Sequence, residues 1–372
     1  MLFQTLAILA IAPGYALSAP WHHGPSRHRD NSTIVNINLL DSAASIKEAA
    51  AFPIEAFSTS NEEATTEAPC TEEDDANVIT GEISTSTSTV KRAALLAALL
   101  PKGQGIRLWS TAQGIVTGAV QLSLSAFNPK SITQSAPAIF STAPDGTAAL
   151  EVHFKSGSWT YKGPKPSALS FYGRPLDFTG AKEVTTSYQV FFPSGFDFVK
   201  GGKLPGLYGG NDPSVAQGCS GGRRDTRCFS VRFMWRANGA GELYTYLPDP
   251  SFGSDFAGNT NLCTTVSGSV CSSVYGASVG RGSFYFPTGQ WTTIAQRVRL
   301  NDPGVSNGEL ELIVEGESKF TIGGLRFTDS VNTAPVGLQA QSFFGGSTSD
   351  WASSNDQSLF MKNFNMVVTE NF

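Results

Sequence analysis

Histidine is scarce in this sequence, which has 4 histidines in 372 residues and only His153 beyond residue 28. Most of the chain therefore offers too few histidines for a metal site built on several of them, and only one candidate for a histidine that acts as catalytic base. His153 itself lies in the largely apolar run 150–154, and we expect it to belong to a strand rather than to a catalytic site.

Long apolar runs are also absent. The run at residues 2–12 falls short of the roughly 20 apolar residues of a membrane-spanning helix, and no later stretch approaches that length. The small residues Gly14, Ala16 and Ser18 follow it and fit a signal-peptidase site, although no basic residue precedes the run. We expect residues 1–18 to be a signal peptide and the mature protein to be secreted, extracellular and free of membrane attachment.

Charged residues make up only 15% of the chain and are unevenly distributed. Residues 20–100 hold 12 acidic and 5 basic side chains, whereas residues 101–372 hold 19 acidic and 21 basic ones. So small a basic excess, without a basic stripe, is not typical of a nucleic-acid-binding protein. A mildly cationic region does suit an anionic substrate.

Residues 19–101 combine few aromatic side chains with acidic clusters and a Ser/Thr run at 84–89. Such a segment buries too little apolar surface to offset its ordering entropy, so we expect a disordered pro-segment or linker with one isolated helical patch at 93–100. Lys91 and Arg92 are either a site for a kexin-like protease or two exposed charges. Asn31 begins an N-glycosylation sequon.

Beyond residue 101 there is neither a long helical periodicity nor an internal repeat. Alternating or apolar segments separated by glycine and proline turns predict strands instead. The predicted strands lie at 149–155, 168–172, 184–192, 228–236, 242–247, 283–286, 291–300, 309–315, 318–322, 337–344 and 358–368. Many strands without intervening helices predict one all-β domain at 102–372, an antiparallel β-sandwich or jelly roll.

The 5 cysteines agree with secretion. Cys219 with Cys228, and Cys263 with Cys271, would each close a short Gly/Ser-rich loop, and this pairing is the simplest of the three connectivities that four cysteines allow. We expect structural disulfides, because a metal site would require histidines as well. Cys70, in the acidic segment, is left over.

Two glycine pairs enclose Lys203 in the segment 201–210, and Pro205 stiffens the backbone just after it. Downstream, residues 228–236 and 242–247 alternate with period two and predict two strands joined by a hairpin turn at Asn238 and Gly239. Their polar faces share one side of the sheet. That side carries Ser230, Arg232, Met234, Arg236, Glu242, Tyr244 and Tyr246.

The segment 196–207, the Ser-x-Arg element at 230–232 and the Tyr-x-Tyr element at 244–246 resemble polysaccharide lyase family 14 and its fungal relatives. The resemblance runs from about residue 140 to the C-terminus. It implies a jelly-roll fold, cleavage of polyuronates such as alginate or glucuronan, and functional roles for Lys203, Ser230, Arg232, Tyr244 and Tyr246. The cysteine-bearing loop 218–228 is similar to a feature of fungal members.

Polyuronates can be broken without water by β-elimination, in which a base removes the C5 proton and an acid protonates the departing O4. The site must neutralise the adjacent carboxylate and stabilise the charge that develops on it, and Lys203 and Arg232 are suitable residue types. A tyrosine is a weak base unless nearby cations favour its phenolate, which is the environment we expect for Tyr244 or Tyr246. Of the two, Tyr246 is preferred as the base.

Further candidates for substrate binding are Ser230, Gln189 and Arg236, although Arg236 is as able to pair with Glu242. Without a nearby histidine, one tyrosine is expected to act as base and acid in turn. This suits D-mannuronate and D-glucuronate, whose C5 proton and leaving group share one side of the ring, better than L-guluronate. We expect a monomer that needs no cofactor or metal and whose partner is an anionic polysaccharide.

Two other functions remain open at this point. A carbohydrate-binding jelly roll or wall protein would use the same lysine and tyrosines without catalysis. A glycoside hydrolase needs two carboxylates flanking the scissile bond, and only Glu242 lies on the polar face.

Overall fold

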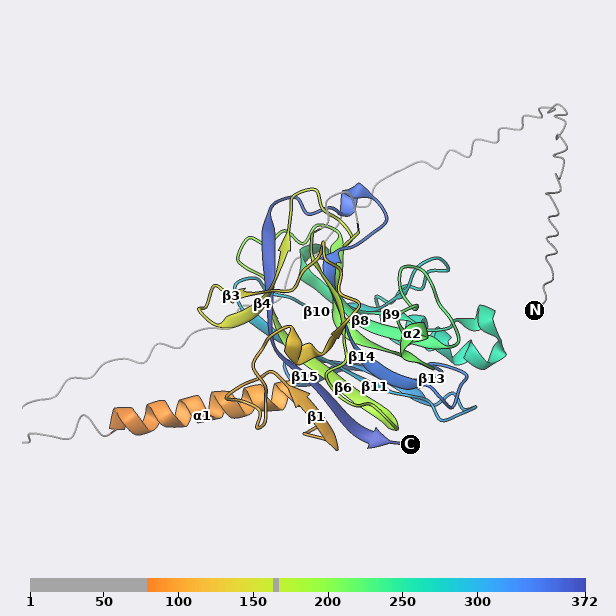
Figure 1. The fold of residues 1–372 in the computed structure, drawn as a ribbon, viewed down its shortest axis with the longest axis horizontal. Coiled ribbons are helices and arrows are strands. Elements are labelled where there is room, and N and C mark those ends of the chain that lie inside the picture. The colour runs from red at the N-terminus through yellow and green to blue at the C-terminus, as the bar shows by residue number, and fades with distance from the viewer. Residues whose placement is uncertain (1–78, 163–166) are drawn as a thin grey trace, which may run out of the picture. The chain divides into compact units, whose positions relative to one another are not determined.

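Two antiparallel sheets make up most of the structure, a computed structural model that describes residues 79–162 and 167–372 (Figure 1). The larger sheet contains β1 (Arg107–Ser110), β3 (Ile139–Thr142), β4 (Ala148–Phe154), β6 (Ala181–Phe191), β11 (Trp291–Arg299), β12 (Gly308–Val314), β13 (Glu317–Leu325) and β15 (Gln357–Asn371). The smaller sheet contains β2 (Pro129–Lys130), β5 (Leu169–Gly173), β7 (Gly201–Gly210), β8 (Cys228–Arg236), β9 (Ala240–Tyr246), β10 (Ala277–Tyr285) and β14 (Ala334–Phe344).

The eight-stranded sheet has the order β13-β12-β11-β6-β15-β4-β3, with β1 paired to β15, and the seven-stranded sheet has the order β10-β9-β8-β7-β14-β5-β2. Helical elements are α1 (Ile79–Leu99), α2 (Pro213–Ala216) and α3 (Asn261–Thr264), with short 3-10 turns at Ser125–Phe127, Ala237–Gly239, Pro250–Phe252, Ser254–Thr260 and Ser349–Trp351. The predicted antiparallel all-β sandwich is confirmed, and each predicted strand overlaps an observed one. Among the described residues, no helix is both long and apolar enough to cross a membrane.

The core fills the space between the two sheets. Phe229, Val231, Phe233 and Trp235 on β8 are fully buried there, and Tyr188 comes from β6 in the opposite sheet. Tyr188 packs edge-on against Phe233, with 5.7 Å between the ring centroids. Each buried side chain of this size stabilises the fold by roughly 1.5–3 kcal/mol. The period-two pattern of β8 thus places its polar residues on the outer face of the smaller sheet.

Helix α1 lies within the segment 19–101 for which the composition predicts no fixed structure. Its end is anchored: Leu99 and Leu100 are buried against Val367, on the outer face of the larger sheet. Ser187 donates to the carbonyl of Leu99, and Lys102 pairs with Glu311. The predicted helical patch at 93–100 is therefore the end of a longer helix, and apolar contact with the sheet orders it. The signal peptide, the sequon and Cys70 lie outside the described residues.

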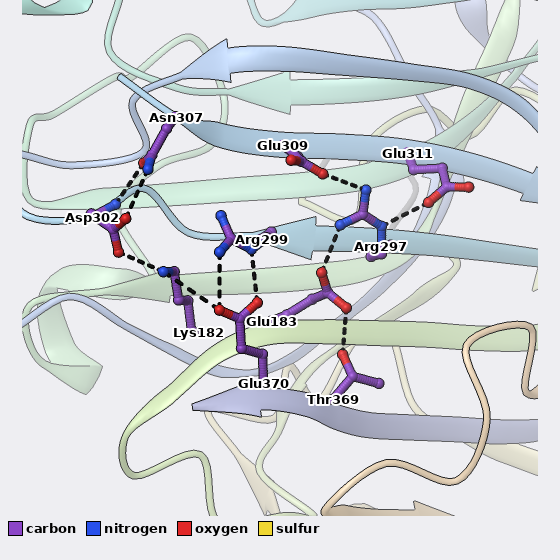
Figure 2. Close-up of polar contacts among 10 residues, drawn as sticks. All are labelled: Lys182, Glu183, Arg297, Arg299, Asp302, Asn307, Glu309, Glu311, Thr369 and Glu370. Carbon is purple, nitrogen blue, oxygen red and sulfur yellow. Dashed lines mark hydrogen bonds and ion pairs between the residues drawn. The ribbon is translucent and has the colours of Figure 1, made fainter. Parts of the chain in front are cut away.

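The outer face of the larger sheet is occupied by paired charges (Figure 2). Arg297 contacts three carboxylates, those of Glu183, Glu309 and Glu311, at 2.6, 2.6 and 2.7 Å. A second group joins Arg299 to Glu370 at 2.8 Å, Glu370 to Lys182 at 3.5 Å, and Lys182 to Asp302 at 2.5 Å. Each of these cations already has a carboxylate, so this face offers little to an anionic ligand.

Candidate active site

Strand β7 lies at the centre of the smaller sheet, between β14 and β8, although its glycines and proline are unfavourable in strands. A Cβ at Gly202 would lie 2.0 Å from the ring of Trp235, so the glycine makes room for that indole in the core. The register between β7 and β8 shifts between Lys203 and Gly206, with Pro205 at the irregularity, where a missing N–H is tolerated. Tyr188 donates to the Pro205 carbonyl at 2.9 Å.

The hairpin from β8 to β9 fixes the neighbouring polar residues. Asn238 and Gly239 have φ of 59° and 78°, the left-handed values that an Asn-Gly hairpin turn requires, so the predicted turn is confirmed. The resulting register pairs Ser230 with Tyr246, Arg232 with Tyr244, and Met234 with Glu242. Lys203 on β7 pairs with Met234 from the other side.

A groove of about 550 Å³ lies on this outer face of the smaller sheet. Its lining comprises Thr160, Tyr161, Lys203, Ser220, Gly221, Arg232, Met234, Arg236, Tyr244, Tyr246, Val270, Ser272, Tyr275, Gly276, Ser278, Arg281, Gln341, Phe343, Gly345, Gly346, Ser347 and Trp351. Four of these side chains are cationic, five are tyrosine or tryptophan, and none of the described lining residues is acidic. The groove therefore combines positive charge with aromatic surface, as binding of an anionic sugar chain requires.

Lys203 and Arg232 lie buried at the floor of the groove, each without a carboxylate partner in the described part of the chain. The Lys203 ammonium contacts Met234 Sδ at 2.8 Å and lies 3.4 Å from the centroid of the Tyr244 ring. Burial, with the charges of Arg232 and Arg236 adding to it, holds the pKa of Lys203 well below its ordinary value. Arg232 donates from Nη1 to Gln341 Oε1 at 3.2 Å, and its buried Nε has no hydrogen-bond partner among the described residues.

The two tyrosines stand edge to face, with ring centroids 5.6 Å apart. Burial raises the pKa of Tyr244, and the adjacent Tyr246 adds to that effect. The expected lowering by nearby cations is therefore wrong for Tyr244, because loss of hydration outweighs the attraction of Arg236. The Tyr246 hydroxyl accepts a hydrogen bond from the backbone N–H of Gly222 at 3.2 Å.

The structure brings Lys203, Arg232, Arg236, Tyr244 and Tyr246 together as expected from the sequence. Other candidates lie elsewhere. Ser230 is fully buried and donates to the carbonyl of Cys219 at 2.7 Å, so it anchors the neighbouring loop instead of lining the groove.

Gln189 does not reach the groove, because β6 belongs to the larger sheet. Its side chain is engaged there by Thr293 and Asn363. His153 is on β4 of the same sheet, within hydrogen-bond distance of Ser358 Oγ at 3.2 Å. The expectation of a strand histidine is confirmed, whereas Gln189 as a substrate-binding residue was wrong.

Sequence reasoning missed several groove residues. Arg281 lies between Gly280 and Gly282, whose φ values of 64° and 82° mark an irregular backbone, and this pair of glycines around a cation was a usable signal. Gln341 alternates with core residues along β14 and was also identifiable by period two. Trp351 lies on a loop between strands and has no such signal.

Both predicted disulfides are present. Cys219 pairs with Cys228 and Cys263 with Cys271, with Cα atoms 5.7 and 5.6 Å apart. The first closes the loop that carries Gly222 and ends where β8 begins. It therefore fixes a groove wall relative to the strand that holds Arg232.

The family model of polysaccharide lyase 14 matches residues 142–364. The chain belongs to polysaccharide lyase family 14. The PL-14 alginate lyase from the marine species Aplysia kurodai is 32% identical, with a TM-score of 0.55, and the match covers 62% of this chain and 87% of that one. The alginate lyase vAL-1 from Chlorella virus is 22% identical, with a TM-score of 0.53, and shares the fold over 66% of this chain and 93% of the other. No curated protein sequence matches the chain.

Membership of polysaccharide lyase family 14 decides between the functions left open by the sequence. The chain is a polysaccharide lyase, so a binding or wall protein without catalysis is set aside. The glycoside hydrolase fails on geometry as well, because the described lining residues of the groove include no carboxylate, whereas that reaction needs two.

Proposed function

We propose that this lyase cleaves a polyuronate by β-elimination on the floor of the groove. The observation that carries the proposal is that Lys203 and Arg232 are buried and that neither forms an ion pair with a carboxylate of the described residues. Buried charges are ordinarily paired, so these two cations are set to receive an anion from the substrate. The alginate specificity named for the Aplysia kurodai enzyme, which is 32% identical, supports a uronate polymer as that substrate.

In this proposal Lys203 and Arg232 bind the carboxylate beside C5 and stabilise the charge that develops there as the proton leaves. Tyr246 removes the C5 proton and returns it to O4, and the Gly222 N–H orients its hydroxyl by donating to the oxygen. Tyr244, whose raised pKa keeps it protonated, donates a hydrogen bond to the bound sugar. One tyrosine acting twice suits polymannuronate and glucuronan better than polyguluronate.

The lowered pKa of Lys203 favours a second assignment of the base. An unprotonated Lys203 amine would accept the C5 proton and return it to the departing O4, while Arg232 alone held the carboxylate. The two assignments differ in what an arginine at position 203 does. Arginine keeps the positive charge and stays protonated. It can therefore replace a lysine that binds the carboxylate, but it cannot replace a lysine that removes the C5 proton.

The test follows the ultraviolet absorbance of the new C4–C5 double bond on polymannuronate, glucuronan and polyguluronate. Wild-type enzyme should release unsaturated products, Tyr246→Phe should be inactive, and Lys203→Arg should retain measurable turnover. If Lys203→Arg is as inactive as Lys203→Ala while Tyr246→Phe still turns over, Lys203 is the base. Absence of unsaturated products from every polyuronate would refute the proposed function.

We also propose that the enzyme is secreted after removal of residues 1–18. The two disulfides support an oxidising compartment. Sequencing the N-terminus of protein recovered from culture medium tests this, and retention of the full-length chain inside the cells would contradict it.

A further inference from the structure

A buried carboxylate lies behind the groove wall. Glu242, on β9, is fully buried, and both of its oxygens are occupied. Oε1 accepts from Nε and Nη2 of Arg236 at 2.9 and 2.6 Å, and Oε2 accepts from Arg281 Nε at 3.0 Å and from Ser278 Oγ at 2.5 Å. A carboxylate enclosed in this way has no free position from which to take a proton from a sugar. Its influence on the groove runs through the two arginines.

The arginine cluster, defined as Arg236, Arg281 and Glu242, retains positive charge. One carboxylate faces two guanidinium groups, which leaves a formal charge of about +1. Nη1 of Arg236 and Nη1 of Arg281 make no hydrogen bond within the described ranges, and both residues line the groove. Their side chains are 12% and 40% exposed, so each retains an accessible edge while Glu242 has none. The cluster therefore has donors available for an anion.

The two guanidinium groups are fixed before any ligand binds. Arg236 lies 5.6 Å from the centroid of the Tyr244 ring and 5.8 Å from that of Trp351, which holds it between two aromatic faces. Arg281 donates to Ser278 Oγ at 3.3 Å from Nε and at 3.0 Å from Nη2, in addition to Glu242. Donors held in place in this way lose little conformational entropy when they bind.

The cluster stands one step along the sheet from the catalytic lysine. Lys203 pairs with Met234 on β8, and Arg236 is the next residue of β8 on the same face. Same-face neighbours on a strand are about 6.6 Å apart, which is on the scale of one sugar unit in an extended polymer. A polyuronate carries a carboxylate on every unit.

We propose that Arg236 and Arg281, positioned by Glu242, bind the carboxylate of the uronate next to the one that is cleaved. The enzyme then selects runs of consecutive uronates rather than isolated ones. This inference rests on the proposed polyuronate lyase function and makes Glu242 a positioning residue, not a catalytic one.

The main test compares Arg281→Gln with wild-type enzyme on a polyuronate and on the same polymer after part of its carboxylates has been reduced to alcohols. Arg281 is partly exposed, so this variant should fold. On the intact polymer its KM should rise roughly ten-fold or more, as expected for loss of a hydrogen bond to a charged group, with kcat nearly unchanged. On the reduced polymer the two enzymes should differ much less. Arg227→Gln is the matched control, since Arg227 is exposed, pairs with Asp225 and does not line the groove.

Glu242→Gln tests the positioning role. It should also raise KM on the intact polymer and have a smaller effect on the reduced one. An equal rise of KM on both polymers, in either variant, would overturn the inference, as would an unchanged KM for Arg281→Gln. A wild-type enzyme that releases no unsaturated product from polyuronates would instead overturn the proposed function, and this inference with it.

Discussion

Replacing Lys203 by methionine separates the cost of this lysine to the fold from its use in catalysis. Lys203 is only 7% exposed, and its ammonium contacts a thioether and an aromatic ring instead of a carboxylate. Methionine has a similar length and packs well against both neighbours. The variant should therefore lose activity while its free energy of unfolding increases. In the wild-type protein, Lys203 would then lower stability in return for activity.

The magnitude follows from the burial of the Lys203 ammonium without a carboxylate partner in the described chain. A buried polar group that lacks its full set of partners costs about 1–3 kcal/mol, so Lys203→Met should stabilise the domain by about that amount near neutral pH. For a domain of this size that raises Tm by about 2–4 °C per kcal/mol. Turnover should fall by about 100- to 1000-fold, the usual effect of removing one group that stabilises developing charge.

The stability difference between wild type and Lys203→Met should depend on pH. Because the folded-state pKa lies below the unfolded value of about 10.5, the unfolded chain binds more protons between the two values, and wild-type stability rises with pH across that window. Methionine has no such contribution. The stability advantage of Lys203→Met should therefore be greatest below the folded-state pKa and should disappear as pH approaches about 10.5.

Lys182→Met is the matched control, measured by denaturant unfolding and by ultraviolet turnover. Lys182 is also 7% exposed, but it pairs with Asp302 and Glu370 on the opposite sheet, so its loss should lower stability and leave activity intact (Figure 2). The reasoning is refuted if Lys203→Met is less stable than wild type at neutral pH, or if it retains activity within about ten-fold of wild type.

Initial rates on purified block polymers should be much higher for polymannuronate or glucuronan than for polyguluronate, and comparable rates would contradict a single tyrosine acting as base and acid. A chain beginning at Lys102 should keep its activity but melt several degrees below one beginning at Ala93, because burial of each of Leu99 and Leu100 contributes roughly 1.5–3 kcal/mol. Equal melting temperatures of the two chains in calorimetry would contradict the anchoring of α1. Replacing the pair Cys219 and Cys228 by serine should destabilise the domain by about 2–4 kcal/mol and reduce turnover more than the same change at Cys263 and Cys271, since only the first loop supplies the N–H that contacts Tyr246. Equal turnover in the two double variants would argue against that contact.

Period-two alternation and turn chemistry were sufficient to predict β8, β9, the Asn-Gly turn between them and the shared polar face. These features are local, since a strand with one buried face determines where its other side chains point. The central strand β7 was not predicted as a strand, because its glycines and proline disfavour strands in isolation. In the folded protein, close packing beneath Gly202 and a tolerated irregularity at Pro205 reverse that preference.

Gln189 and Trp351 show where local patterns stop being informative. Gln189 alternates correctly on β6, yet whether β6 joins the sheet with the groove depends on pairing between residues far apart in sequence. Trp351 reaches the groove from the loop between β14 and β15, and the path of that loop depends on where these two strands lie in the fold. Helix α1 is similar: its last turns are ordered by contact with Val367, more than 260 residues later in the chain.

The anchoring of α1 has a practical consequence for attaching the enzyme to a surface or to another protein. The helix ends on the outer face of the larger sheet, whereas the groove opens on the outer face of the smaller one. With 21 residues, α1 is about 30 Å long and works as a built-in spacer. Coupling a bead or a fusion partner at the start of α1 would attach the enzyme through the larger sheet, leaving the groove on the smaller sheet accessible to long polymer chains.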